Sequence, residues 1–323
     1  MIFKLNKFLF TNISIFFILS TFTLLVYTAY AQETSTLINA TNNTENLISP
    51  NPRGSLFDTS ILIDNQNEIP ITVENLGNNT FLYEGDILFS LPVLRTITNT
   101  TNNMTDFFFI AISKFLDSDP WPNGTVPYQI DPDIPRQFRI IDAIEHWEAN
   151  TPIRFIKLND TNRGNFSNYV TFVFNQNYPD SNDPICASRL GMVGGEQQVY
   201  VPNWCKTGSI IHEIGHVIGL WHEQTRCDRD EYIEIHLENV HPGSRHNWQN
   251  NCFDDPALES QNPDSPVGFG EYDYCSIEHY GRFAGSINGE PVLIPKKPVV
   301  GCNDIGQRNE LSEKDIAGVN SIY

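Results

Sequence analysis

Basic residues are scarce in this chain of 323 residues, which carries 20 Lys and Arg against 39 Asp and Glu, a net charge of −19. A nucleic-acid-binding protein needs a basic face to displace phosphate counterions, so this balance argues against a nucleic-acid partner. After residue 31 the sequence also lacks any apolar segment long enough to cross a bilayer. None of the six cysteines belongs to a Cys-x-x-Cys pair, so disulfide bonds are favoured over a cysteine-based metal site.

The first 31 residues predict a secretory signal peptide. Lys4 and Lys7 give a basic start, residues 13–30 are almost wholly apolar, and Ala31 ends a small-x-small cleavage pattern. The apolar run is long for a signal, so the alternative is an uncleaved anchor, and only then do we expect membrane or cell-surface association. Secretion agrees with the even number of cysteines. It also agrees with dense Asn-x-Ser/Thr acceptor sequences for glycans, at Asn39, Asn42, Asn78, Asn99, Asn103, Asn123, Asn159 and Asn165.

Changes in composition divide the rest of the chain. Residues 32–55 are rich in Asn, Thr and Ser and predict a flexible leader. Short apolar runs within residues 56–95 predict a few strands, but too small a core for a sturdy domain. Residues 96–105 predict a linker, and the composition of a globular domain begins at Phe107, because all five tryptophans follow it.

The globular part combines helical and strand-like patterns. Residues 136–150 carry apolar side chains at helical spacing, and residues 312–322 predict a closing helix with Ser312 and Asp315 at its N-terminus. Three strand-like runs lie between these helices, at residues 153–156, 169–174 and 197–201. After His222 the chain is rich in Asn, Asp, Pro and Gly. We therefore expect an α+β domain with a regular half, an irregular half and a cleft between them.

One short segment predicts a catalytic zinc site. His212 and His216 are four residues apart on one helix face, so both imidazoles can reach a single ion. Gly219 permits a sharp turn that brings His222 to the same ion. Three imidazoles leave the fourth position of one Zn²⁺ per chain to water, and Glu213 can accept a proton from that water. The alternative, a set of hydrogen-bonded core histidines, is disfavoured because ionisable groups in so apolar a helix need an ion or other partners.

The sequence after the third histidine extends this motif with Glu223, Arg226, Asp228 and Arg229. The extended motif resembles that of the astacin family of zinc metalloendopeptidases, in the metzincin group. Three further segments resemble the same family: residues 121–128, 276–283 and 305–323. The resemblance implies a two-lobed zincin fold. Its upper lobe would hold a mixed sheet and the active-site helix, its lower lobe would be irregular, and a small propeptide would precede both.

The resemblance also implies roles for individual residues. The zinc ligands would be His212, His216 and His222. Glu213 would act as the general base. Tyr280 falls on the family's tyrosine, which touches zinc at rest and swings to stabilise the oxyanion. Glu223 matches the residue that holds the newly formed N-terminus, since a buried carboxylate needs a cationic partner.

Residues 81–87 (FLYEGDI) resemble the family's propeptide motif, in which the aspartate, here Asp86, binds zinc in place of water. Taken alone, Gly-Asp predicts only a turn. With a zinc site downstream, a carboxylate on a flexible arm becomes a competitive ligand. We therefore expect a propeptide with linker at residues 32–110 and a catalytic domain at residues 111–323. An activating protease would cut between Met104 and Trp121, with Ala111 a candidate first residue.

Two features depart from the family pattern. Glu278 stands where the family has a methionine beneath the zinc, so a carboxylate replaces an apolar floor. Three interpretations stay open: the side chain rotates away, it is protonated, or the turn differs locally. Among the cysteines, only Cys186 and Cys205 fit a pair of the family. Two further bridges could form in three ways among Cys227, Cys252, Cys275 and Cys302.

The sequence thus predicts a secreted zinc-dependent endopeptidase, made as a latent precursor, that acts on protein or peptide substrates. The substrate would add as a strand to an exposed sheet edge near residues 186–192. One alternative is an inactive zincin-fold binding module, because Glu278 replaces the methionine. The other is a different secreted zinc hydrolase, such as a cell-wall amidase.

Overall fold

The structure, a computed structural model, describes residues 54, 56–62, 68–77, 80–90, 94–96, 109–111, 120–174, 185–250 and 270–323. The predicted signal peptide, most of the leader, Met104 and Cys252 lie outside the described residues, as do five of the eight glycan acceptor sequences: Asn39, Asn42, Asn78, Asn99 and Asn103.

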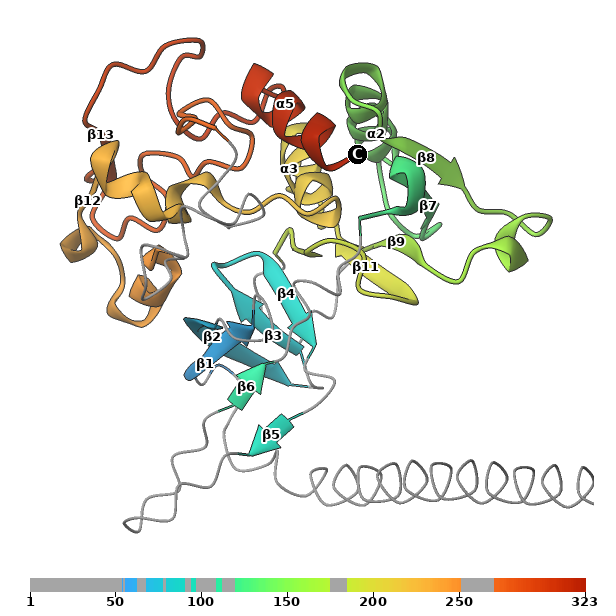
Figure 1. Cartoon of the computed structure of the whole chain (residues 1–323), viewed down its shortest axis with the longest axis horizontal. Helices are drawn as coiled ribbons and strands as arrows, with labels where there is room; N and C mark the ends of the chain where they lie inside the picture. The colour runs from blue at the N-terminus through green and yellow to red at the C-terminus, as the bar shows by residue number, and fades with distance from the viewer. Residues whose placement is uncertain are drawn as a thin grey trace, which may run out of the picture. The chain divides into compact units, whose positions relative to one another are not determined.

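A four-stranded sheet forms the first layer of the globular domain, in the order β11-β9-β7-β8 (Figure 1). Its strands are β7 (Thr125–Ile130), β8 (Arg154–Lys157), β9 (Tyr169–Val173) and β11 (Glu196–Tyr200). All neighbouring pairs run parallel. An antiparallel bridge between Ala187 and Tyr200 links the sheet to the segment that carries β10 (Ser188–Arg189), which gives the expected mixed character. Strands β8, β9 and β11 confirm the three strand-like runs.

Helices α2 (Phe138–Asn150) and α3 (Thr207–Val217) pack side by side (Figure 1). The apolar face of α2 is buried, including Trp147, whose Nε1 donates a hydrogen bond of 2.9 Å to the Ile211 carbonyl on α3. This pairing confirms both predicted helices and anchors the helix that carries the zinc motif. No helix in the described part of the chain has the length and apolar character needed to cross a membrane.

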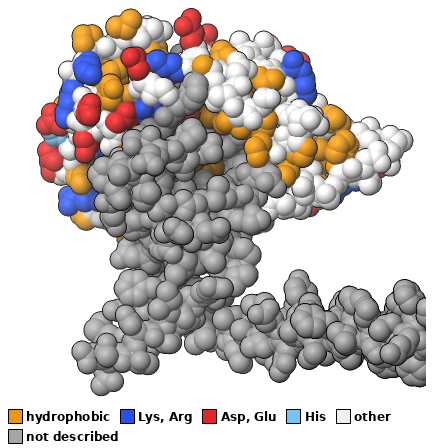
Figure 2. Space-filling model, in the orientation of Figure 1, with side chains coloured by type: hydrophobic (Ala, Val, Ile, Leu, Met, Phe, Trp, Pro, Cys, Tyr) orange, Lys and Arg blue, Asp and Glu red, His pale blue; other side chains and the backbone are white. Residues whose placement is uncertain are grey.

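The C-terminal half is irregular, as predicted. Its regular elements are β12 (Ile233–Ile235) paired antiparallel with β13 (Leu293–Pro295), and helix α5 (Glu313–Ile322). The short 3-10 segments of the described chain are Pro122–Gly124, Arg163–Asn165, Glu223–Thr225, Cys227–Glu231, Leu237–Asn239 and Pro242–Trp248. Basic and acidic side chains are interspersed over the lobe with β12 and β13 in the face that Figure 2 shows.

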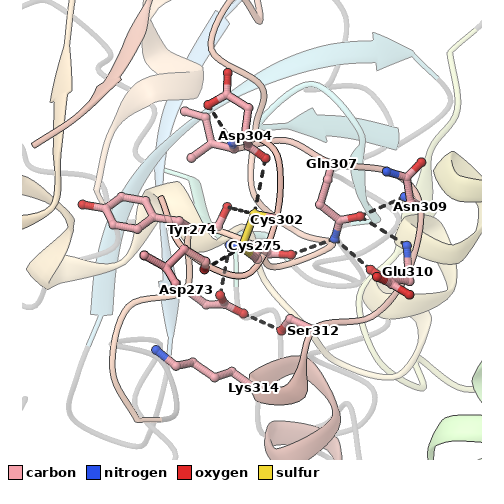
Figure 3. The surroundings of a disulfide bond; sticks show 12 residues. Asp273, Tyr274, Cys275, Cys302, Asp304, Gln307, Asn309, Glu310, Ser312 and Lys314 are labelled. Atoms are coloured by element: carbon pink, nitrogen blue, oxygen red, sulfur yellow. Dashed lines mark hydrogen bonds between the residues drawn. A yellow bond between two sulfur atoms is a disulfide. The ribbon is translucent and has the colours of Figure 1, made fainter. Parts of the chain in front are cut away.

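Disulfide bonds reinforce the domain. Cys186 pairs with Cys205, which confirms the pair implied by the resemblance, and Cys275 pairs with Cys302. Cys227 is also disulfide-bonded. The second bridge joins two stretches of the irregular half just before α5, where Gln307 Nε2 donates to the Cys275 carbonyl at 2.7 Å (Figure 3).

A second sheet is built mainly from strands within residues 56–111. Its strands are β1 (Leu56–Leu62), β2 (Glu68–Gly77), β3 (Thr80–Tyr83), β4 (Ile87–Ser90), β5 (Leu94–Thr96) and β6 (Phe109–Ala111). The catalytic segment β10 adds to this sheet parallel to β4.

The expectation of a flexible arm around Asp86 is wrong, because Asp86 lies in the tight connection of the β3–β4 hairpin. The hairpin is ordered because its apolar side chains share a buried cluster with Leu190 of the catalytic domain, against which Trp221 also packs. The hairpin and β2 contribute to this cluster Ile71, Val73, Phe81, Tyr83 and Ile87.

Candidate metal centre

Helix α3 presents the first two histidines, as the spacing predicts. His212 and His216 project from its buried length, and each is at most 2% exposed. The helix ends at Val217, and Gly219 then adopts φ +105°, a conformation that a side chain would make strained. The turn brings in His222, which is 1% exposed.

The three imidazoles converge on the carboxylate of Asp86. Its Oδ2 lies 3.3 Å from His212 Nε2, and its Oδ1 lies 3.8 Å from His216 Nε2 and 3.1 Å from His222 Nε2. One ligand atom from each of the four residues lies within 4.8 Å of the other three. These residues therefore surround a volume the size of one metal ion.

The opposite nitrogen of each ring faces an oxygen. His212 Nδ1 lies 3.0 Å from the Ile277 carbonyl and His216 Nδ1 lies 2.8 Å from the Leu220 carbonyl. His222 Nδ1 lies 2.7 Å from Glu84 Oε2. A proton donated from Nδ1 leaves the lone pair on Nε2, which is the form of histidine that binds a metal.

Unsatisfied atoms and electrostatics show that a cation fits this centre. His216 Nε2, His222 Nε2 and Asp86 Oδ1 are buried without a hydrogen-bond partner. Burial by itself lowers the pKa of His222, yet Asp86 and Glu84 raise it to about 10. The carboxylates thus favour a positive charge at this point. Burial lowers the pKa of His212 and His216, which keeps these rings neutral, as metal ligands must be. Three histidine nitrogens and a carboxylate oxygen form a tetrahedral zinc ligand set.

Glu213 follows the first ligand on α3. Its side chain is buried, and its Oε2 has no hydrogen-bond partner. Burial first, and then the nearby Asp86, raise the pKa of Glu213 well above its usual range. The backbone carbonyl of Glu213 accepts a hydrogen bond of 2.9 Å from Ser188 Oγ, which ties α3 to β10.

Tyr280 lies at the other side of the histidines. Its ring centroid is 4.6 Å from that of His222 and 5.3 Å from that of Trp248. Its hydroxyl donates to the backbone carbonyl of Glu84. The phenol is therefore held by the β3–β4 hairpin.

The conformation of the β3–β4 turn explains how the Glu84 carbonyl reaches the Tyr280 hydroxyl. Glu84 and Gly85 have φ of 50° and 88°, so two successive residues adopt the left-handed conformation typical of tight hairpin turns. A Cβ at Gly85 would lie 3.3 Å from the Tyr280 hydroxyl. The Asp86 carbonyl accepts a hydrogen bond of 3.0 Å from the backbone N–H of Ser188. Glycine thus lets the turn approach Tyr280 closely.

Glu223 occupies a polar position behind the third ligand. It accepts a hydrogen bond of 2.6 Å from the Asp273 backbone N–H, and its Oε1 lies 3.3 Å from Arg226 Nη1. Burial raises its pKa to about 8, although Arg226 opposes the shift. In this structure Glu223 therefore pairs with Arg226.

Two carboxylates contact the histidines in ways that the sequence did not predict. Glu84 was not predicted, because an acid beside Gly-Asp is common in turns and nothing in the spacing links it to His222. Glu278 does not rotate away from the site, so that interpretation is wrong: its Oε2 lies 2.8 Å from His212 Nδ1.

The helix with two histidines, the glycine turn and the third histidine define a zinc protein of the metzincin class. Residues 115–323 match the family model described as Astacin, a peptidase family, and the chain belongs to this family.

Individual relatives agree with this assignment. The chain is 33% identical over 246 residues to protein SpAN of Strongylocentrotus purpuratus, covering 75% of this chain and 37% of that protein. It is 31% identical over 280 residues to astacin-like metalloprotease toxin 1 of Loxosceles intermedia, covering 84% of this chain and 88% of the toxin.

The fold also resembles the solved structure of high choriolytic enzyme 1, a hatching enzyme zinc-protease from the medaka Oryzias latipes. The TM-score is 0.50 with 31% sequence identity, covering 64% of this chain and 92% of that one. Some curated relatives are much longer than this chain, which spans 37% of SpAN and 32% of blastula protease 10 from Paracentrotus lividus.

Proposed function

We propose that this chain is a secreted zinc endopeptidase, made as a latent precursor, that hydrolyses peptide bonds in protein substrates. One observation carries the proposal: three buried Nε2 atoms converge on one carboxylate oxygen pair, with the unpartnered Glu213 on the same helix. The relatives named as a metalloprotease toxin and a zinc-protease support the same chemistry.

His212, His216 and His222 would hold the zinc. When bound, the metal polarises the scissile carbonyl and lowers the pKa of a water ligand to about 7. Glu213 takes the proton from the attacking water and returns it to the leaving amine. The raised pKa of Glu213 suits a group that must act as both base and acid. The Tyr280 hydroxyl donates a hydrogen bond to the oxyanion.

Latency follows from three contacts of the propeptide hairpin. The Asp86 carboxylate would take the zinc position that water needs, and the Glu84 carbonyl holds the Tyr280 hydroxyl. Strand β4 pairs with β10, the edge near residues 186–192 on which we expect a substrate to add. Removal of the hairpin by an activating protease would free all three positions together.

The domain division that we propose is a signal peptide at residues 1–31, a propeptide at 32–110 and a catalytic domain at 111–323. Strand β6 ends at Ala111, which agrees with a cut close to this residue. The new N-terminal amine would replace Arg226 as the partner of Glu223. Disulfide bonds are consistent with an extracellular location, and three acceptor asparagines are exposed for glycans: Asn123, Asn159 and Asn165.

The catalytic proposal is tested with mature protein from culture medium. We expect casein cleavage that is abolished by a chelator and by Glu213→Gln, while Glu145→Gln, an exposed glutamate on α2, retains activity. Cleavage that survives Glu213→Gln would contradict the mechanism. Bound zinc without cleavage of any protein would favour the binding module that Glu278 suggests, and release of cell-wall peptides alone would favour an amidase.

The latency proposal needs the uncleaved precursor. Asp86→Ala should cleave casein before any processing, more slowly than mature protein, because zinc loses the competing ligand while the contacts of the hairpin with Tyr280 and β10 stay in place. Glu74→Gln in β2 of the same sheet serves as the control and should stay inactive. An Asp86→Ala precursor as inert as the wild type would reject the role of Asp86.

A further inference from the structure

Glu278 is a buried acid that the proposed reaction does not use. The residue is 2% exposed, and neither oxygen of its carboxylate has a hydrogen-bond partner. No lysine or arginine of the described chain forms an ion pair with it. An isolated carboxylate in such a place costs free energy unless a cation lies close by.

The Glu278 carboxylate lies against the zinc-binding histidines on the side away from Asp86. Its Oε2 is 2.8 Å from His212 Nδ1 and 3.6 Å from His216 Nδ1. His216 Nδ1 is already engaged by the Leu220 carbonyl. His212 Nδ1 therefore is the ring atom that Glu278 meets most closely, in competition with the Ile277 carbonyl at 3.0 Å.

The space for this carboxylate comes from Gly215 on α3. A Cβ at that position would lie 1.9 Å from Glu278 Oε1, so alanine could not replace glycine without moving the carboxylate. The Glu278 carboxylate can therefore occupy this position only because residue 215 has no side chain.

The turn that carries Glu278 is fixed by hydrogen bonds. The Ile277 N–H donates to Asp315 Oδ2 at 2.9 Å, and the Glu278 N–H donates to Ser276 Oγ at 3.0 Å. Ser276 Oγ in turn donates to Asp315 Oδ1 at 2.7 Å. These hydrogen bonds fix the backbone from which the Glu278 carboxylate reaches His212.

We propose that Glu278 is a positioning residue that orients the His212 imidazole and strengthens its bond to zinc. This inference rests on the proposed function, in which His212 binds zinc. A carboxylate beside the outer nitrogen of a metal-bound histidine raises the basicity of the ligand, and loss of such a partner typically weakens metal binding about 10–100-fold. A bound dication would add to the attraction that His222 and Arg308 already exert on the Glu278 carboxylate.

The test measures the dissociation constant of zinc for the full-length precursor by competition with a chelator of known affinity. We expect Glu278→Gln and Glu278→Met each to bind zinc about 10–100-fold more weakly than wild type. Glu290→Gln, an exposed glutamate of the same half, is the matched control and should equal wild type. The absorption bands of bound Co²⁺ should shift in the two Glu278 variants only.

A second measurement separates this role from a structural one. The thermal midpoint of the metal-free protein should be unchanged or raised in both Glu278 variants, because each removes a buried carboxylate without a hydrogen-bond partner. Zinc binding within twofold of wild type would overturn the inference and leave the proposed function intact. Weaker binding accompanied by a lower metal-free midpoint would also overturn it. A wild-type protein that binds no zinc would overturn both.

Discussion

Asp315 offers a test of how the last helix supports the metal centre. It occupies the third position of α5 in a capping box with Ser312, and it is 8% exposed. Its carboxylate accepts hydrogen bonds from Ser276 Oγ at 2.7 Å, from the Ile277 N–H at 2.9 Å and from the Ser312 N–H at 2.9 Å. Asp315→Ala therefore removes the hydrogen bonds that join the turn at residues 276–278 to helix α5.

The expected loss follows from these three contacts. A hydrogen bond to a charged group contributes about 1.5–3 kcal/mol, so three contribute roughly 4–9 kcal/mol before offsets. Burial raises the pKa of Asp315, which means that ionising this carboxyl in the fold is costly, and alanine avoids that cost. We therefore expect the free energy of unfolding to fall by about 3–5 kcal/mol, at the upper end of single substitutions.

Urea unfolding of the precursor in the presence of a chelator measures this loss without a contribution from zinc. Glu313→Ala, an exposed residue one position into the same helix, should change the free energy of unfolding by no more than about 0.5 kcal/mol. Asp315→Asn should fall between the two, because its amide oxygen still accepts hydrogen bonds. If Asp315→Ala lowered the free energy of unfolding by less than about 1 kcal/mol, the Asp315 carboxylate would not be what holds the turn at residues 276–278.

Four further outcomes are expected. Burial lowers the pKa of His279 to about 4 from 6.5, so its contribution to stability is complete above pH 6.5 and is lost as the pH falls towards 4. Between pH 7.5 and 5 this loss is about 2 kcal/mol in urea unfolding, and it should vanish in His279→Gln. Replacing Cys275 and Cys302 by serine opens a bridge between positions 27 residues apart and should cost about 3 kcal/mol by the same measurement. Gly306→Ala should lower the free energy of unfolding by at least about 2 kcal/mol, because φ is 76° and the new Cβ would lie 2.1 Å from the Gly281 Cα. Gly289→Ala, at φ 80° in open space, should lower it by only about 1 kcal/mol. Adding zinc at a thousand times its dissociation constant should raise the free energy of unfolding by about 4 kcal/mol, and an unchanged midpoint would count against the centre.

The zinc histidines could be predicted from the sequence because their geometry is local. A helix fixes the relation of His212 to His216, and one glycine turn fixes that of His222. Asp86 is 126 residues from His212, and no periodicity links the two positions. Only the resemblance to a family motif brought it into the site. Glu84 had no such signal, since its contact depends on the left-handed turn that aims it at His222.

The packing of the β3–β4 hairpin could not be predicted from the residues around it alone. Residues 56–95 contain too little apolar surface for a separate core, and that estimate holds for the segment by itself. The missing surface comes from Leu190 and Trp221, more than a hundred residues further along the chain. Strand β3 (Thr80–Tyr83) was not among the apolar runs that predict strands, and it forms between β2 and β4 as its partners.

Acidic residues give the centre a different charge before and after the proposed activation. In this structure Asp86, Glu84, Glu213 and Glu278 all lie in or against the histidine cluster, and the first two raise the pKa of His222 to about 10 against the effect of burial. Cleavage would remove Asp86 and Glu84 with the hairpin. Glu213 and Glu278 would remain, and because burial raises the pKa of both, a cation held by the histidines would favour their charged forms. An astacin-family site with methionine at position 278 would have one acid fewer. The substitution at this position therefore bears on how firmly the mature enzyme retains zinc once the propeptide ligand has gone.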